Sequence, residues 1–101
     1  MAWQCRRWSQ IFKVDERDRI VPTSTWEHQC LRQFGPHRST FVVATVRPAE
    51  WEGWDWQVRV PYKPVASGSA SSRKQAMHQA DKALRESKSM EEAKAGIGGR
   101  R

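Results

Sequence analysis

The chain has 101 residues, of which 18 are Lys or Arg and 11 are Asp or Glu, so its formal net charge is +7. This length suits a single domain with one modest core. The positive charge favours an acidic partner such as nucleic acid. No run of about 18 apolar residues is present, which excludes a membrane-spanning helix. Residues 1–13 hold no continuous apolar stretch after their arginines, so no secretory signal is predicted and we expect a cytoplasmic protein.

The first 22 residues fit two local structures. In one, the charged stretch 15–19 is the turn of a β-hairpin between short strands. In the other, residues 2–13 form a helix, because Cys5, Trp8 and Phe12 recur at helical spacing. We favour the strands, and treat residues 1–22 as an N-terminal extension of a single domain that covers residues 1–87. Residues 88–101 are predicted to be a flexible basic tail.

Residues 24–34 are predicted to form an amphipathic helix. Ser24 and Glu27 have the spacing of a capping box, in which each side chain accepts a backbone N–H. Gly35 and Pro36 follow as helix terminators. The apolar residues of this segment share one helical face, namely Trp26, Cys30, Leu31 and Phe34.

Two strands and a short third one are predicted next. Residues 40–47 are rich in β-branched side chains, and residues 54–60 alternate so that Trp54, Trp56, Val58 and Val60 share one face while Arg59 lies on the wet face. Residues 65–70 return as the third strand. A second helix is expected over residues 72–86. The predicted core consists of Trp56, Val58, Val43, Ala76, Ala80 and Leu84, with Trp26 and Phe34 beside them.

The expected fold is therefore α+β: an antiparallel sheet of at least three strands, packed on one face by two helices, in the order α-β-β-β-α from residue 24. The closing segment carries Gly68, Ser72, the Arg73–Lys74 pair, Ala76 and Ala80. With the element order, this segment resembles the double-stranded-RNA-binding domain. The motif is incomplete, because Met77 stands where that family has a third lysine. The resemblance implies that Arg73 and Lys74 contact phosphates from the start of the second helix.

The function favoured by these observations is a small non-catalytic module that binds nucleic acid resembling duplex RNA. Its predicted contact residues are Arg73, Lys74, Lys63 and Arg59. The alternative is a regulator or inhibitor, of the kind phages and mobile elements encode, that binds a protein partner. Trp51 is the candidate anchor for such a partner, because Trp is enriched at binding hot spots. No catalytic motif is recognised, so no enzyme is expected.

Two cysteines are too few for a disulfide scaffold in a chain of this size, and Cys5 and Cys30 are expected to be thiols. A metal-ligand set can be assembled from these cysteines with His28 and His37. It has neither CxxC nor HxxxH spacing, so no metal site and no cofactor are predicted.

Overall fold

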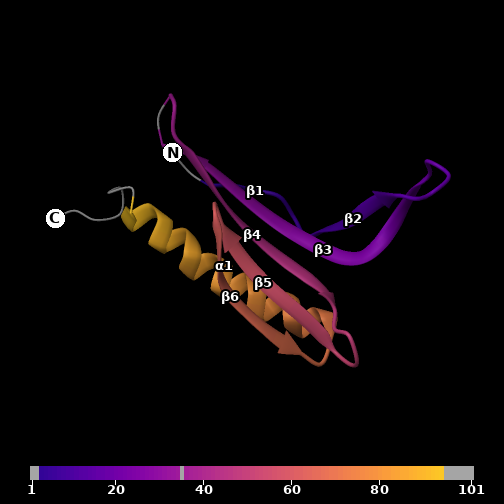
Figure 1. Cartoon of the computed structure of the whole chain (residues 1–101). Coiled ribbons are helices and arrows are strands. Elements are labelled where there is room, and N and C mark those ends of the chain that lie inside the picture. The colour runs from indigo at the N-terminus through magenta and orange to yellow at the C-terminus, as the bar shows by residue number, and fades with distance from the viewer. Residues whose placement is uncertain (1–2, 35, 95–101) are drawn as a thin grey trace.

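The computed structural model describes residues 3–34 and 36–94. These residues form an antiparallel sheet and one helix. The strands are β1 (Gln4–Cys5), β2 (Ser9–Val14), β3 (Ile20–Gln33), β4 (Ser39–Pro48), β5 (Trp54–Val60) and β6 (Lys63–Ala70), and the helix is α1 (Arg73–Lys94). The strand order is β1-β3-β4-β5-β6, and β2 pairs with the N-terminal part of β3. Helix α1 crosses one face of the sheet, over β4, β5 and β6 (Figure 1).

The prediction of two helices on a sheet of three strands or more is wrong. Residues 24–33 belong to the long strand β3, so the described residues contain six strands and a single C-terminal helix. The capping-box spacing of Ser24 and Glu27 does not start a helix, because this segment pairs on both sides. Glu27 lies opposite Ser9 of β2 and opposite Thr45 of β4.

The other elements follow the sequence pattern more closely. Residues 9–14 and the first residues of β3 form the predicted hairpin, with its turn at residues 15–19. Helix α1 begins as expected, since the Ser72 hydroxyl accepts the Gln75 backbone N–H at 3.1 Å. The helix then continues to Lys94, beyond its predicted end at residue 86. The rest of the predicted tail, residues 95–101, lies outside the described residues.

The core lies between the helix and the sheet face that it covers. Strand β4 contributes three residues to it, and β3, β5 and α1 contribute the others. The buried core residues are Cys30, Val42, Ala44, Val46, Val58, Val60, Ala76, Ala80 and Leu84. Trp56 packs against this cluster from its edge. The prediction of Val43 as a core residue is wrong, because its neighbours Val42 and Ala44 are fully buried and successive strand residues point to opposite faces. Trp26 and Phe34 are half-buried.

The two cysteines are not thiols in the structure. Cys5 and Cys30 are directly opposite each other in the β1–β3 pairing and are joined by a disulfide. Thiols were predicted because two cysteines are too few for a disulfide scaffold. The assignment of residue 30 to a helix also hid the cross-strand pairing that brings the two side chains together. Among the described residues, no helix is both long and apolar enough to cross a membrane.

The hairpin of β2 and the start of β3 extends beyond the sheet as a two-stranded arm, seen on the right of Figure 1. Three large apolar side chains of the arm are exposed: Phe12 by 55%, Val14 by 64% and Ile20 by 75%. Phe12 pairs with Pro22, and Val14 pairs with Ile20. The arm therefore presents an apolar surface that helix α1 does not reach.

Candidate nucleic-acid interface

The solvent side of α1 carries a stripe of basic side chains. Lys74, His78, Lys82 and Arg85 are exposed and lie at helical positions i, i+4, i+8 and i+11, which share one face. Asp81 does not face this stripe, because its carboxylate accepts hydrogen bonds from Trp8 and contacts His28. Among the described residues, none of the stripe's side chains is held in an ion pair.

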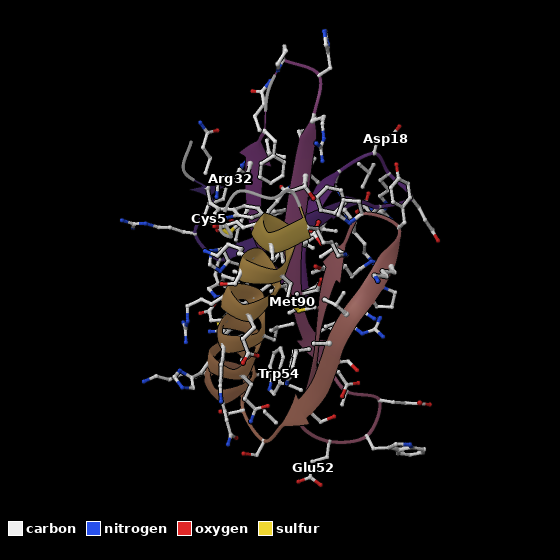
Figure 2. The ribbon with its side chains drawn as sticks, turned by 90° about the vertical axis from the view of Figure 1, so that its left-hand side faces the viewer. Cys5, Asp18, Arg32, Glu52, Trp54 and Met90 are labelled. Atoms are coloured by element: carbon white, nitrogen blue, oxygen red, sulfur yellow. A yellow bond between two sulfur atoms is a disulfide. The ribbon has the colours of Figure 1, made fainter. Side chains whose placement is uncertain are left out.

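Two further arginines, Arg6 and Arg7, lie in the connection between β1 and β2. Cys5 contacts the Lys88 ammonium at 3.8 Å, and the Trp8 indole N–H donates to Asp81 at 3.2 Å. The connection between β1 and β2 is therefore fixed to α1 at two points about 10 Å apart along the helix axis. Arg6 and Arg7 lie between Cys5 and Trp8 in the sequence and are exposed, and the Arg6 backbone N–H donates to the Gln29 carbonyl of β3 at 2.9 Å. Figure 2 shows Cys5 beside the helix.

These residues define what we call the basic face: Arg6, Arg7, Lys74, His78, Lys82 and Arg85. Lys74 and Arg85 are eleven residues apart, which corresponds to about 16 Å of helix. The first helical turn contains no acidic residue. The helix dipole adds to the positive potential there. Phosphates of one duplex strand follow each other at about 3.4 Å along the axis of the nucleic acid. The basic face is therefore long enough to contact several phosphates of one backbone.

The structure separates the four residues that the sequence predicts as nucleic-acid contacts. Arg73 and Lys74 are exposed at the start of α1. Lys63 begins β6, and Ala70, just before the helix, ends it, so the two ends are about 23 Å apart. Arg59 is exposed on β5 and points away from the helix, as its position between buried Val58 and Val60 requires. Of the four, only Lys74 belongs to the basic face, with Arg73 at its border.

Arg73 has a partner within the chain. Its guanidinium lies 4.6 Å from the centroid of the Trp26 ring on β3. Such a cation–π contact restrains the side chain, although the guanidinium keeps its charge and its donors. Arg73 is therefore positioned where the helix start meets the sheet, beside Lys74.

Trp51, the predicted anchor for a protein partner, is 92% exposed. It lies in the loop between β4 and β5, which is closed by a hydrogen bond from the Ala49 N–H to the Gly53 carbonyl at 3.0 Å. The loop therefore holds the ring away from the sheet. This position leaves the indole available to a partner.

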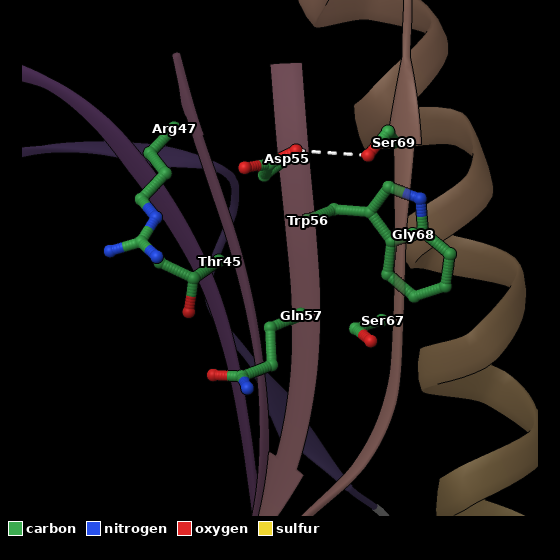
Figure 3. Close-up of a pocket in the computed structure, with 8 residues that line it drawn as sticks. All are labelled: Thr45, Arg47, Asp55, Trp56, Gln57, Ser67, Gly68 and Ser69. Carbon is green, nitrogen blue, oxygen red and sulfur yellow. Dashed lines mark hydrogen bonds between the residues drawn. The ribbon is translucent and has the colours of Figure 1, made fainter. Parts of the chain in front are cut away.

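On the sheet face opposite the helix, the region around the N-terminal part of β5 is polar. Figure 3 shows a pocket on it, lined by Thr45, Arg47, Asp55, Trp56, Gln57, Ser67, Gly68 and Ser69. Asp55 and Ser69 bond each other at 2.9 Å, and Arg47 lies opposite Asp55 in the strand pairing. The opposite charges of Arg47 and Asp55 leave this pocket without the positive excess of the basic face.

The sequence contained the signal for Lys82 and Arg85, because their spacing from Lys74 places all three on one face of the predicted second helix. It contained no local signal for Arg6 and Arg7. Their place depends on contacts between Trp8 and Asp81, which are 73 residues apart.

Comparisons with models of known protein families, with curated proteins and with solved structures find no match.

Proposed function

We propose that the protein binds nucleic acid through the phosphate backbone, and that the basic face makes the contact. The observation that carries this proposal is the row of exposed basic side chains along α1, which form no ion pair with other described residues, together with the exposed Arg6 and Arg7 in the β1–β2 connection. Phosphate contacts of this kind position a protein on the nucleic acid without reading its sequence. Duplex RNA is the first ligand to test, with duplex DNA and single strands beside it. Such a partner is met in the cytoplasm, which is the compartment we infer.

Salt dependence measures the number of phosphate contacts. When the logarithm of the binding constant is plotted against the logarithm of the salt concentration, the slope is about −0.9 for each duplex phosphate that the protein neutralises. The double variant Lys82→Ala/Arg85→Ala should therefore weaken binding and make the slope shallower by roughly two units. Arg73→Ala/Lys74→Ala should have a similar effect. Fluorescence anisotropy with labelled duplexes at several salt concentrations gives both quantities.

A matched control is available on the same chain. Arg59→Ala/Lys63→Ala removes the same charge, but from residues that the fold separates from the basic face. We expect this variant to keep the slope of the wild-type protein. Equal changes in all three double variants would mean that net charge alone attracts the ligand. That result, or no binding by the wild type at moderate salt, would contradict the proposal.

A regulator that binds a protein partner is the second candidate function. The exposure of Trp51, at 92% for the residue, favours it, because a large apolar ring in water is available for burial in an interface. Affinity based on such an anchor responds weakly to salt, in contrast to phosphate binding. Trp51→Ala should leave nucleic-acid binding unchanged. A photoreactive side chain at position 51 that crosslinks one protein, with little dependence on salt, would favour this function.

A further inference from the structure

A cysteine–histidine cluster lies on the sheet face under α1, beside the edge strand β1. Side-chain ligand atoms of Cys5, His28 and Cys30 all lie within 4.8 Å of one another. Cys30 and His28 are two residues apart on β3 and therefore share a face, and Cys5 is the cross-strand partner of Cys30. The sequence offers four candidate metal ligands, and the fold brings three of them together. His37 is in the turn between β3 and β4, outside this cluster.

The histidine is oriented by a carboxylate. His28 Nδ1 lies 2.9 Å from Asp81 Oδ1, and Asp81 also accepts the Trp8 indole N–H. With Nδ1 engaged in this way, Nε2 is the nitrogen that remains for a ligand. Metal-bound histidines are usually held by a carboxylate or carbonyl at their other ring nitrogen, which fixes the tautomer. The Trp8 ring lies against His28 with 5.3 Å between centroids and restricts its rotation.

We propose that the dithiol form of this protein binds a zinc ion through Cys5, Cys30 and His28. Two thiolates and one imidazole are a soft ligand set that suits zinc, with water or a partner's side chain in the fourth position. Tetrahedral zinc separates such ligands by about 3.5–3.8 Å, given bonds of about 2.3 Å to sulfur and about 2.0 Å to nitrogen. The cluster therefore needs adjustments of the order of 1–2 Å. The short strand β1 lies at the sheet edge and can supply them.

The change from disulfide to zinc site is a balanced exchange. A dithiol reductant of the thioredoxin class supplies two electrons and two protons, becomes a disulfide itself, and leaves Cys5 and Cys30 as thiols. Zinc then binds the two thiolates, and the two thiol protons go to solvent. The Lys88 ammonium lies 3.8 Å from Cys5 Sγ, where its positive charge favours a thiolate. Both states of the cysteine pair fasten β1 to β3, one by a covalent bond and the other through the metal.

Cobalt provides the first test. The full chain is reduced with dithiothreitol, desalted under nitrogen and titrated with Co²⁺. We expect one equivalent to bind, with thiolate charge-transfer bands in the near ultraviolet and intense visible bands of a tetrahedral site. Zinc should displace the cobalt. The oxidised protein should show none of these bands, because a disulfide offers no thiolate.

Variants identify the ligands. Cys5→Ser and His28→Ala should abolish the tetrahedral spectrum, while His37→Ala and His78→Ala, at exposed positions, should keep it. Asp81→Asn should weaken zinc binding by about 10–100-fold, measured by competition with a chromophoric chelator. Circular dichroism of each reduced variant checks folding. Cobalt binding that persists in His28→Ala would overturn the proposal. So would a reduced wild type that binds no metal, whether it stays folded or unfolds without recovery on addition of zinc.

Discussion

Gly68 provides a sharp test of how the helix and sheet fit together. It lies opposite Trp56 in the β5–β6 pairing, and the indole ring covers it on the side of α1 (Figure 3). A methyl group at position 68 would lie 2.7 Å from Trp56 Nε1 and 2.8 Å from its Cε2 and Cζ2 atoms. The ring would have to move. Its N–H donates to Gln79 Oε1 on α1 at 2.8 Å, so movement also endangers this link to the helix.

The expected destabilisation follows from three contributions. Forcing an extra methyl group into a packed site costs about 1–3 kcal/mol. Losing the hydrogen bond between Trp56 and Gln79 costs about 0.5–1.5 kcal/mol more. Replacing Gly by Ala offsets about 0.4–1 kcal/mol through the entropy of the unfolded chain. We therefore expect Gly68→Ala to lower the free energy of unfolding by about 0.5–4 kcal/mol. The middle of this range, about 2 kcal/mol, corresponds to a fall in Tm of about 8–16 °C.

A double-mutant cycle assigns this loss to the clash. Urea unfolding, followed by circular dichroism, is compared for the wild type, Gly68→Ala, Trp56→Leu and the double variant. Leu is smaller than Trp and leaves room for the methyl group, so Gly68→Ala should cost little in that background. Ser67→Ala, on the exposed face of the same strand, is the control and should stay within about 0.5 kcal/mol of wild type. An equal cost of Gly68→Ala in both backgrounds would refute the reasoning.

Two further perturbations address the core and the arm. Ala80 is fully buried where α1 meets the sheet, so Ala80→Glu should lower the free energy of unfolding by several kcal/mol, roughly 3 or more. The control Ser89→Glu, on the exposed surface of the helix, should leave it nearly unchanged. Unchanged thermal stability of Ala80→Glu would contradict the packing. At the arm's turn, the Asp15 carboxylate accepts hydrogen bonds from two backbone N–H groups. The bond from Arg19, followed by the one from Arg17, holds the pKa of Asp15 below its ordinary value. The turn should therefore be stabilised above the unfolded carboxyl's pKa and lose this contribution as pH falls through the lowered folded pKa. A carboxyl NMR titration of Asp15 with an ordinary midpoint would contradict this.

The misassigned segment shows what local sequence can and cannot predict. Residues 24–33 form a strand whose core-facing side includes two polar residues, His28 and Arg32, which break the apolar alternation that marks a half-buried strand. The partners that make this burial tolerable lie on α1, far along the chain. His28 meets Asp81 at 2.9 Å, and Arg32 meets Glu92 at 3.2 Å. A local window contains neither carboxylate, so the helical spacing of the apolar residues prevailed.

Strand β5 and the start of α1 were predictable because their signals are local. Alternation places Val58 and Val60 in the core, and Ser72 caps the helix three residues before Gln75. The candidate interface divides in the same way. Lys74 could be found from its helix, whereas the contribution of Arg7 depends on a neighbouring tryptophan that docks on α1 through a contact 73 residues away in sequence.

The link between Cys5 and Cys30 has a topological consequence for the arm. The two residues are 25 positions apart, and the whole of β2, its turn and most of β3 lie between them. In the oxidised protein these residues form a closed covalent ring, and the arm is its outer loop. Arg17 and Arg19 are exposed in the turn, where a protease can reach the backbone. A nick there opens the ring but leaves both pieces of the chain joined, and only reduction of the sulfur bridge lets the N-terminal piece depart.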